Sequence, residues 1–85
     1  MVDFIVEARI SLKHGVLDAE GETIEKSLRL LGYPVESVET VRVYRITIQA
    51  DSKQDALSKA SEAAEKLLAN TVIQDYELKV DSKGV

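Results

Sequence analysis

Side chains in the N-terminal segment alternate between two faces, and this alternation constrains the fold more than any other feature of the sequence. Every even position from 4 to 12 is apolar, and the odd positions between them are occupied by Ile5, Glu7, Arg9 and Ser11. A period of two residues is typical of a β-strand with one buried face. The chain is therefore expected to build a sheet of which one face is covered.

A first helix is predicted over residues 19–31, after a turn-like run at residues 13–16. Asp18 is a suitable N-cap, because its carboxylate can accept hydrogen bonds from the free N–H groups of the first helical turn. Apolar side chains then follow at helical spacing, namely Ile24, Leu28 and Leu31. Gly32 suits the position directly after the helix, and Pro34 prevents its continuation.

Residues 35–50 are rich in β-branched side chains, which favour strands. Because this segment is long for a single strand, we predict two strands that meet near Val43-Tyr44-Arg45. No glycine or asparagine marks a turn at that point, and one long bent strand is the alternative.

A second helix is predicted over residues 53–69. Ser52 and Asp55 have the spacing of a capping box at its start, and Asn70 at its end tolerates the left-handed conformation. Its apolar stripe has helical period and consists of Ala56, Leu57, Ala60, Ala63, Ala64, Leu67 and Leu68. The alanines allow a close approach to another backbone, either in the chain's own sheet or in another subunit.

A last strand is predicted from Val72 to Val80, and residues 81–85 are expected to form a frayed tail. The order of elements is β-α-β-β-α-β. This order predicts the α+β class and a ferredoxin-like fold, with a mainly antiparallel sheet covered by two helices. Residues 1–80 are expected to form a single domain, because a chain of 85 residues has room for only one.

So short a chain has a thin core, and this one has no cysteine from which a disulfide could form. Association with another chain is the remaining means of stabilisation. Exposed strand edges are often covered by a second chain, and the apolar, β-prone run after residue 40 offers little protection at its edge. We therefore expect at least a homodimer, with interface candidates Val41, Val43, Tyr44 and Ile46.

Composition and motifs argue against several functions. The net charge of −4 is spread evenly and is unfavourable for binding nucleic acid. With no long apolar stretch and no basic signal-peptide start, a cytoplasmic location without membrane contact is expected. His14 is the only histidine, and neither a nucleophilic triad nor a phosphate-binding glycine motif is present. We therefore assign no catalytic, cofactor-binding or metal-binding residue to this chain.

Three blocks of sequence carry a resemblance to a known family. Ser11-Leu12-Lys13 and Gly15-Val16-Leu17-Asp18, followed by Gly21, resemble the family's opening block. Leu31-Gly32-Tyr33 and the residues from Val38 to Arg42 resemble its middle block, and the run from Glu65 to Tyr76 resembles its closing block. The chain is thereby identified as a member of the PurS family over about residues 2–80, with a shorter segment near Val43-Tyr44-Arg45 than is usual there.

The resemblance implies a noncatalytic subunit of phosphoribosylformylglycinamidine synthase, an enzyme of de novo purine biosynthesis. In that family a dimeric PurS bridges a PurL-type synthetase subunit and a PurQ-type glutaminase subunit and supports the transfer of ammonia between them. The complex, rather than this chain, would use ATP, Mg and glutamine. The alternative is a stand-alone regulatory domain of the ACT type, which has the same order of elements and binds an amino acid at a subunit interface; Gly15 after the first strand is compatible with it.

Overall fold

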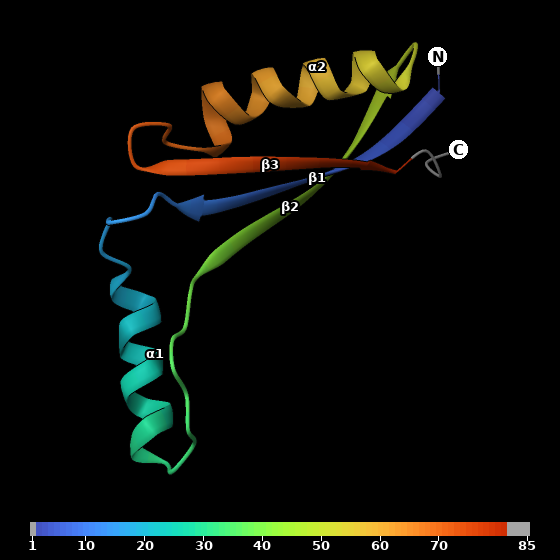
Figure 1. The fold of residues 1–85 in the computed structure, drawn as a ribbon. Helices are drawn as coiled ribbons and strands as arrows, with labels where there is room; N and C mark the ends of the chain where they lie inside the picture. The colour runs from blue at the N-terminus through green and yellow to red at the C-terminus, as the bar shows by residue number, and fades with distance from the viewer. Residues whose placement is uncertain (1, 82–85) are drawn as a thin grey trace.

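The computed structural model describes residues 2–81, in which three strands form one antiparallel sheet (Figure 1). The elements are β1 (Val2–Leu12), α1 (Ala19–Leu30), β2 (Val41–Ala50), α2 (Lys53–Ala63), a π-helical turn η1 (Ala64–Leu68), and β3 (Gln74–Asp81). The strand order is β2-β1-β3, so the N-terminal strand is the central one. The expected α+β class with a ferredoxin-like antiparallel sheet is confirmed.

The core lies between α2 and one face of the sheet. Phe4 and Val6 of β1 are buried, and they pack with Ala50 at the end of β2 and with Ala56 and Ala60 of α2. An alanine side chain ends at Cβ, so the helix backbone lies close to the sheet. The alanine stripe is thus explained by packing within the chain itself. Val6 is the largest side chain among the described residues that is fully buried, which makes the core thin.

The end of α2 differs from the expected helix terminus. The N–H of Ala69 donates to the carbonyl of Ala64 at 2.8 Å, and this wide π turn replaces the left-handed end expected at Asn70. One extra residue in the turn rotates the side chains that follow. Leu68 therefore packs against the core, whereas Leu67, which was expected in the apolar stripe, is 83% exposed.

The predicted division of residues 35–50 into two strands is wrong, and the alternative of one long strand is correct. Residues 41–50 pair continuously with β1, from Val41 opposite Ser11 to Ala50 opposite Val2. The residues before Val41 are not strand, because their polar groups are engaged with α1: the Arg29 guanidinium donates to the carbonyls of Val35 and Glu36 at 2.9 and 2.8 Å. The sheet consequently has three strands in the described chain.

Helix α1 does not cover the sheet, contrary to the expectation of two covering helices. Together with the returning segment it forms a projection, which we call the arm (residues 17–40) and which extends away from one end of the sheet (Figure 1). Its helical features are as expected: Asp18 is the N-cap, and Gly32 follows the helix with a φ of +95°. Only the position of the helix was missed, because its apolar residues face no part of the described chain closely enough to bury them.

The C-terminal strand begins and ends later than expected. Residues 71–73 form a turn in which the Asn70 carbonyl accepts from the N–H groups of Ile73 and Gln74, so β3 starts at Gln74. Asp81 is the last residue of β3 and not part of a tail. The rest of the expected frayed tail, residues 82–85, lies outside the described residues.

Candidate functional site

The four interface candidates all lie in β2, which is an outer strand of the sheet. Within residues 2–81, β2 pairs only with β1, so its other edge has no strand beside it. Alternation along β2 divides the candidates between two faces. Val41 and Val43 lie on the open face and are 38% and 47% exposed, whereas Tyr44 and Ile46 are half-buried on the side of α2. The structure therefore brings them to one edge but not into one patch.

The two outer strands differ in how well their edges are protected against pairing. β3 carries a charged side chain at every second position on the open face: Asp75, Glu77, Lys79 and Asp81. The corresponding positions of β2 hold Val41, Val43, Arg45, Thr47 and Gln49. Charged side chains discourage the addition of a strand at an edge. The edge of β2 is thus the more suitable one for pairing with another chain.

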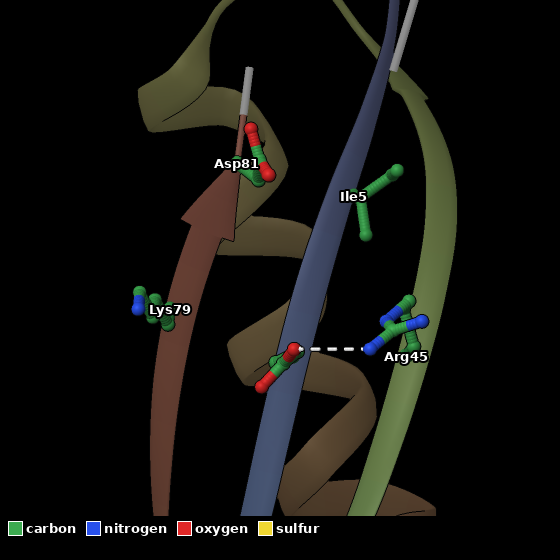
Figure 2. Close-up of a pocket in the computed structure, with 5 residues that line it drawn as sticks. Ile5, Arg45, Lys79 and Asp81 are labelled. Atoms are coloured by element: carbon green, nitrogen blue, oxygen red, sulfur yellow. Dashed lines mark hydrogen bonds and ion pairs between the residues drawn. The ribbon is translucent and has the colours of Figure 1, made fainter. Parts of the chain in front are cut away.

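The open face of the sheet, opposite α2, presents charges of both signs. Arg45 of β2 lies 3.5 Å from the Glu7 carboxylate of β1, and Lys79 of β3 stands opposite Glu7 in the strand register. Figure 2 shows the shallow pocket around them, with Ile5, Arg45, Lys79 and Asp81 on its rim. An exposed ion pair of this kind contributes little to stability. Such a surface is suited to contacts with charged side chains of another chain.

The arm exposes an unusual amount of apolar surface for its size. Gly21 is the only buried residue in it. Leu30 is 89% exposed, and the other large apolar side chains of the arm that remain exposed are Leu17, Ile24, Leu31 and Tyr33. Clusters of exposed apolar residues are typical of protein–protein contact sites. The arm is therefore the strongest candidate for a docking surface in the described chain.

The base of the arm is held together by the Asp18 carboxylate. One oxygen accepts from the N–H of Gly21 at 2.9 Å and from the hydroxyl of Thr40 at 3.0 Å, and the other accepts from the N–H of Thr40 at 2.7 Å. These donors, with the N–H of Thr40 as the largest cause, hold the pKa of Asp18 below its ordinary value of 3.8. Thr40 directly precedes β2, so Asp18 connects the start of α1 to the start of a strand.

Close packing of the helix on the returning segment explains the glycine at position 21. A Cβ atom there would lie 2.6 Å from the backbone carbonyl oxygen of Val38 and 2.7 Å from the Asp18 side chain. Further along the helix, Arg29 forms an ion pair with Glu25 at 2.7 Å while it donates to the two carbonyls of the returning segment. The arm is thus fastened along its length by Asp18, Gly21 and Arg29.

The other features considered from the sequence are His14, a metal site and a membrane-spanning helix. His14 lies exposed in the turn after β1 and lines a shallow cavity with Lys13 and Glu39. Among residues 2–81, no three histidine, cysteine or carboxylate side chains are placed to hold a metal ion together. No helix in that range has the length and hydropathy needed to cross a bilayer.

The role of Thr40 at the base of the arm and the bonds of Arg29 to the returning segment were missed from the sequence, which indicated for Arg29 only an ion pair with Glu25. Asp18 was recognised only as a helix cap, because its bond to Thr40 spans 22 residues of sequence. Asp18 and Gly21 both belong to the opening block that carries the resemblance described above. The geometry of the arm therefore explains these two residues of the block, and the bond from Asp18 to Thr40 could not be predicted from helix signals alone.

Comparison with known proteins agrees with this geometry. Residues 5–82 match the PurS family, described as phosphoribosylformylglycinamidine (FGAM) synthase. A relative from Archaeoglobus fulgidus, phosphoribosylformylglycinamidine synthase subunit PurS, is 51% identical over 75 residues, which are 87% of this chain and 94% of that protein.

Solved structures extend the similarity to the whole fold. PurS of Methanocaldococcus jannaschii, one of the subunits of formylglycinamide ribonucleotide amidotransferase, has a TM-score of 0.85 at 39% identity and covers 93% of this chain and 96% of its own. A chain in the structure of PurLQS from Thermotoga maritima has a TM-score of 0.88 at 30% identity, covering 95% of this chain and 100% of its own. The arm therefore belongs to the shared fold, because these alignments leave almost none of the chain out.

Proposed function

Because the chain belongs to the PurS family of phosphoribosylformylglycinamidine synthase subunits, we propose that it joins a PurL-type synthetase subunit to a PurQ-type glutaminase subunit. The observation that carries this proposal is the likeness of nearly the whole chain to a chain of the PurLQS complex. Membership of the family also decides between this function and the amino-acid-binding regulatory domain considered from the sequence.

The reaction of the complex is the ATP- and glutamine-dependent amidation of formylglycinamide ribonucleotide, in the cytoplasm, as part of purine biosynthesis. The glutaminase subunit releases ammonia and the synthetase subunit consumes it, with ATP and Mg bound away from this chain. The role of this chain is to hold the two active subunits in a fixed relative position, so that ammonia passes from one to the other. Its contribution is a set of surfaces and not a reacting group.

Three surfaces of the chain support a bridging role. The arm offers apolar side chains, the outer edge of β2 offers unpaired backbone groups, and the open face of the sheet offers charges of both signs. They lie on different parts of the molecule, as Figure 1 shows for the arm and the sheet. One small domain can therefore contact more than one other chain at once. We assign the edge of β2 to a second copy of this chain and the arm to contacts within the larger complex.

Reconstitution from purified subunits tests the proposal. The synthetase and glutaminase subunits together should form little product from glutamine, and addition of this chain should restore glutamine-dependent synthesis. The chain alone should hydrolyse neither glutamine nor ATP. Full glutamine-dependent activity without the chain, or glutaminase activity of the pure chain, would show that the proposed role is wrong.

Matched variants locate the contact. Leu30 on the arm and Leu67 after α2 are both leucines with more than four-fifths of their surface exposed, at 89% and 83%. Leu30→Glu should weaken the complex, because it places a charge in an apolar contact. Leu67→Glu makes the same change outside the arm and should leave assembly intact. Equal effects of the two substitutions on co-purification would contradict the assignment of the arm.

A further inference from the structure

The arm is connected to the rest of the molecule at one end only, where the chain enters it and leaves it. The chain enters it through residues 13–17 and leaves it at Thr40, and α1 does not pack on the sheet. The direction of the arm is therefore not set by a packed core, as the direction of α2 is. It depends on the contacts at the two crossings, where Asp18 binds Thr40.

The hydrogen bonds at the base of the arm are arranged to hold the arm in one orientation relative to the sheet. The Asp18 carboxylate uses both oxygens, and its donors come from the first turn of α1 and from the residue preceding β2. Hydrogen bonds to a charged acceptor are shorter and stronger than those between neutral groups. Thr40 directly precedes Val41, which pairs with Ser11 of β1, so these bonds tie the start of α1 to the edge of the sheet.

We infer that Asp18 is a positioning residue: through Thr40 it fixes the direction in which the arm leaves the sheet, and so presents the apolar side chains of the arm to a partner chain in a preset orientation. This inference rests on the proposed function for the identity of the partner, but not for the geometry of the joint. A preset arm loses little conformational entropy when it binds, and the complex is correspondingly tighter. A free arm of the same composition would bind with lower affinity.

Helix capping and positioning can be separated by the choice of substitution. Serine is a good N-cap, so Asp18→Ser keeps the bond to the first turn of α1. Its single oxygen on a shorter side chain cannot also hold both groups of Thr40. Thr40→Val removes only the hydroxyl donor and should give a smaller effect. Ser52→Ala is the matched control, because Ser52 caps α2 by accepting from the N–H of Asp55 and has no part in the arm.

The direction of the arm can be measured directly, because the chain contains no cysteine and two can be introduced as sites for spin labels. Lys26 on α1 and Ser58 on α2 are both exposed. Double electron–electron resonance measures the distance between labels at these two positions, and labelled chains are diluted with unlabelled ones so that only distances within one chain are seen. The distance distribution should be narrow in the parent and after Ser52→Ala. Asp18→Ser should at least double the width of this distribution. An equally narrow distribution after Asp18→Ser would overturn the inference.

A second readout concerns assembly. Activation of the synthetase and glutaminase subunits by Asp18→Ser should need about tenfold more of the chain, with the same activity at saturation, because the arm is ordered only on binding. Unchanged concentration dependence together with a widened distribution would also overturn the inference. Failure of the parent itself to activate the subunits would instead contradict the proposed function, and the distance measurement would still decide the role of Asp18.

Discussion

The hydroxyl of Tyr76 donates a hydrogen bond to the carboxylate of Glu65 at 3.1 Å. The same hydroxyl lies 2.9 Å from the Ser61 hydroxyl, which acts as donor there because the proton of Tyr76 is directed to Glu65. Tyr76 belongs to β3, Ser61 to α2 and Glu65 to the π turn. The Tyr76 hydroxyl thus connects the outer strand β3 to both α2 and the π turn that follows it.

Replacement of Tyr76 by phenylalanine should therefore destabilise the domain while leaving its packing in place. The ring is retained and two partly exposed hydrogen bonds are lost, so the free energy of unfolding should fall by about 1 kcal/mol. Urea denaturation followed by circular dichroism measures the change. Tyr33→Phe on the exposed arm is the control and should have no effect. Equal stability of the Tyr76 variant and the parent would show that these bonds contribute nothing.

The thin core predicts a large contrast between two apolar truncations. Val6 is fully buried against α2, and Val6→Ala should lower the free energy of unfolding by about 2 kcal/mol, from lost burial and an unfilled cavity. Leu67→Ala removes more atoms but from an exposed side chain, and should change it by less than about 0.5 kcal/mol. Denaturation midpoints of both variants test the position of the π turn. A larger loss at Leu67 would mean that η1 is not formed in solution.

Association through β2 can be tested by adding a charge to its edge. Val43→Lys places an ammonium group on the open face of this outer strand and should shift the protein from dimer to monomer at micromolar concentration. Val72→Lys makes the same substitution in the turn before β3, at a side chain that is 81% exposed, and should leave association unchanged. Sedimentation equilibrium distinguishes the two. A parent protein that remains monomeric throughout would contradict the proposed homo-oligomer.

The lowered pKa of Asp18 predicts how the arm responds to acid. Because the pKa is lower in the folded protein than the ordinary value of 3.8, the bonds of this carboxylate stabilise the fold fully above that value. The stabilisation is lost as the pH falls from 3.8 through the lowered folded pKa. The distribution of distances between the spin labels on α1 and α2 should accordingly stay narrow at neutral pH and widen only below about pH 4.

The pH dependence must be assigned to the right group, since other charged residues share the cavities beside Asp18: Lys13, His14, Glu20, Glu39 and Arg42. A carboxyl carbon titration of Asp18 by NMR, compared with the amide shift of Thr40, makes the assignment. Both should follow one curve with a midpoint below 3.8. Widening of the distance distribution well above pH 4 would contradict the prediction.

Local signals in the sequence were sufficient for much of the fold. The alternation of β1, the caps at Asp18 and Ser52 and the glycine after α1 each depend on neighbouring residues and on general backbone chemistry. These features were predicted correctly. The boundaries of β2 were not, because residues 35–40 have the same β-branched composition as the strand itself. Their first two carbonyls bond to Arg29 and Thr40 bonds to Asp18, and such bonds between the two sides of the arm leave no periodic pattern in the sequence.

The candidate surfaces were less predictable, for a related physical reason. The apolar residues of α1 have the spacing expected of a helix that covers a sheet, yet Ile24 and Leu31, the residue directly after the helix, are exposed. A sequence pattern shows that a face is apolar but not which chain covers it. The π turn likewise has no recognisable signal in the sequence, although it determines that Leu68 and not Leu67 packs against the core. Both errors concern what an apolar side chain packs against, and neither concerns whether the helix forms.

The central position of β1 has a consequence for the synthesis of the protein. Of the three strands in residues 2–81, the one synthesised first is the one with which both others must pair, and the last ends at Asp81. Until α2 has emerged, the nascent chain exposes the apolar face around Val6 to the surrounding cell. The sheet can close only after β3 has been synthesised, so the domain folds largely in a single step. A polypeptide that stops before residue 74 lacks β3 and should aggregate instead of forming a partly folded domain.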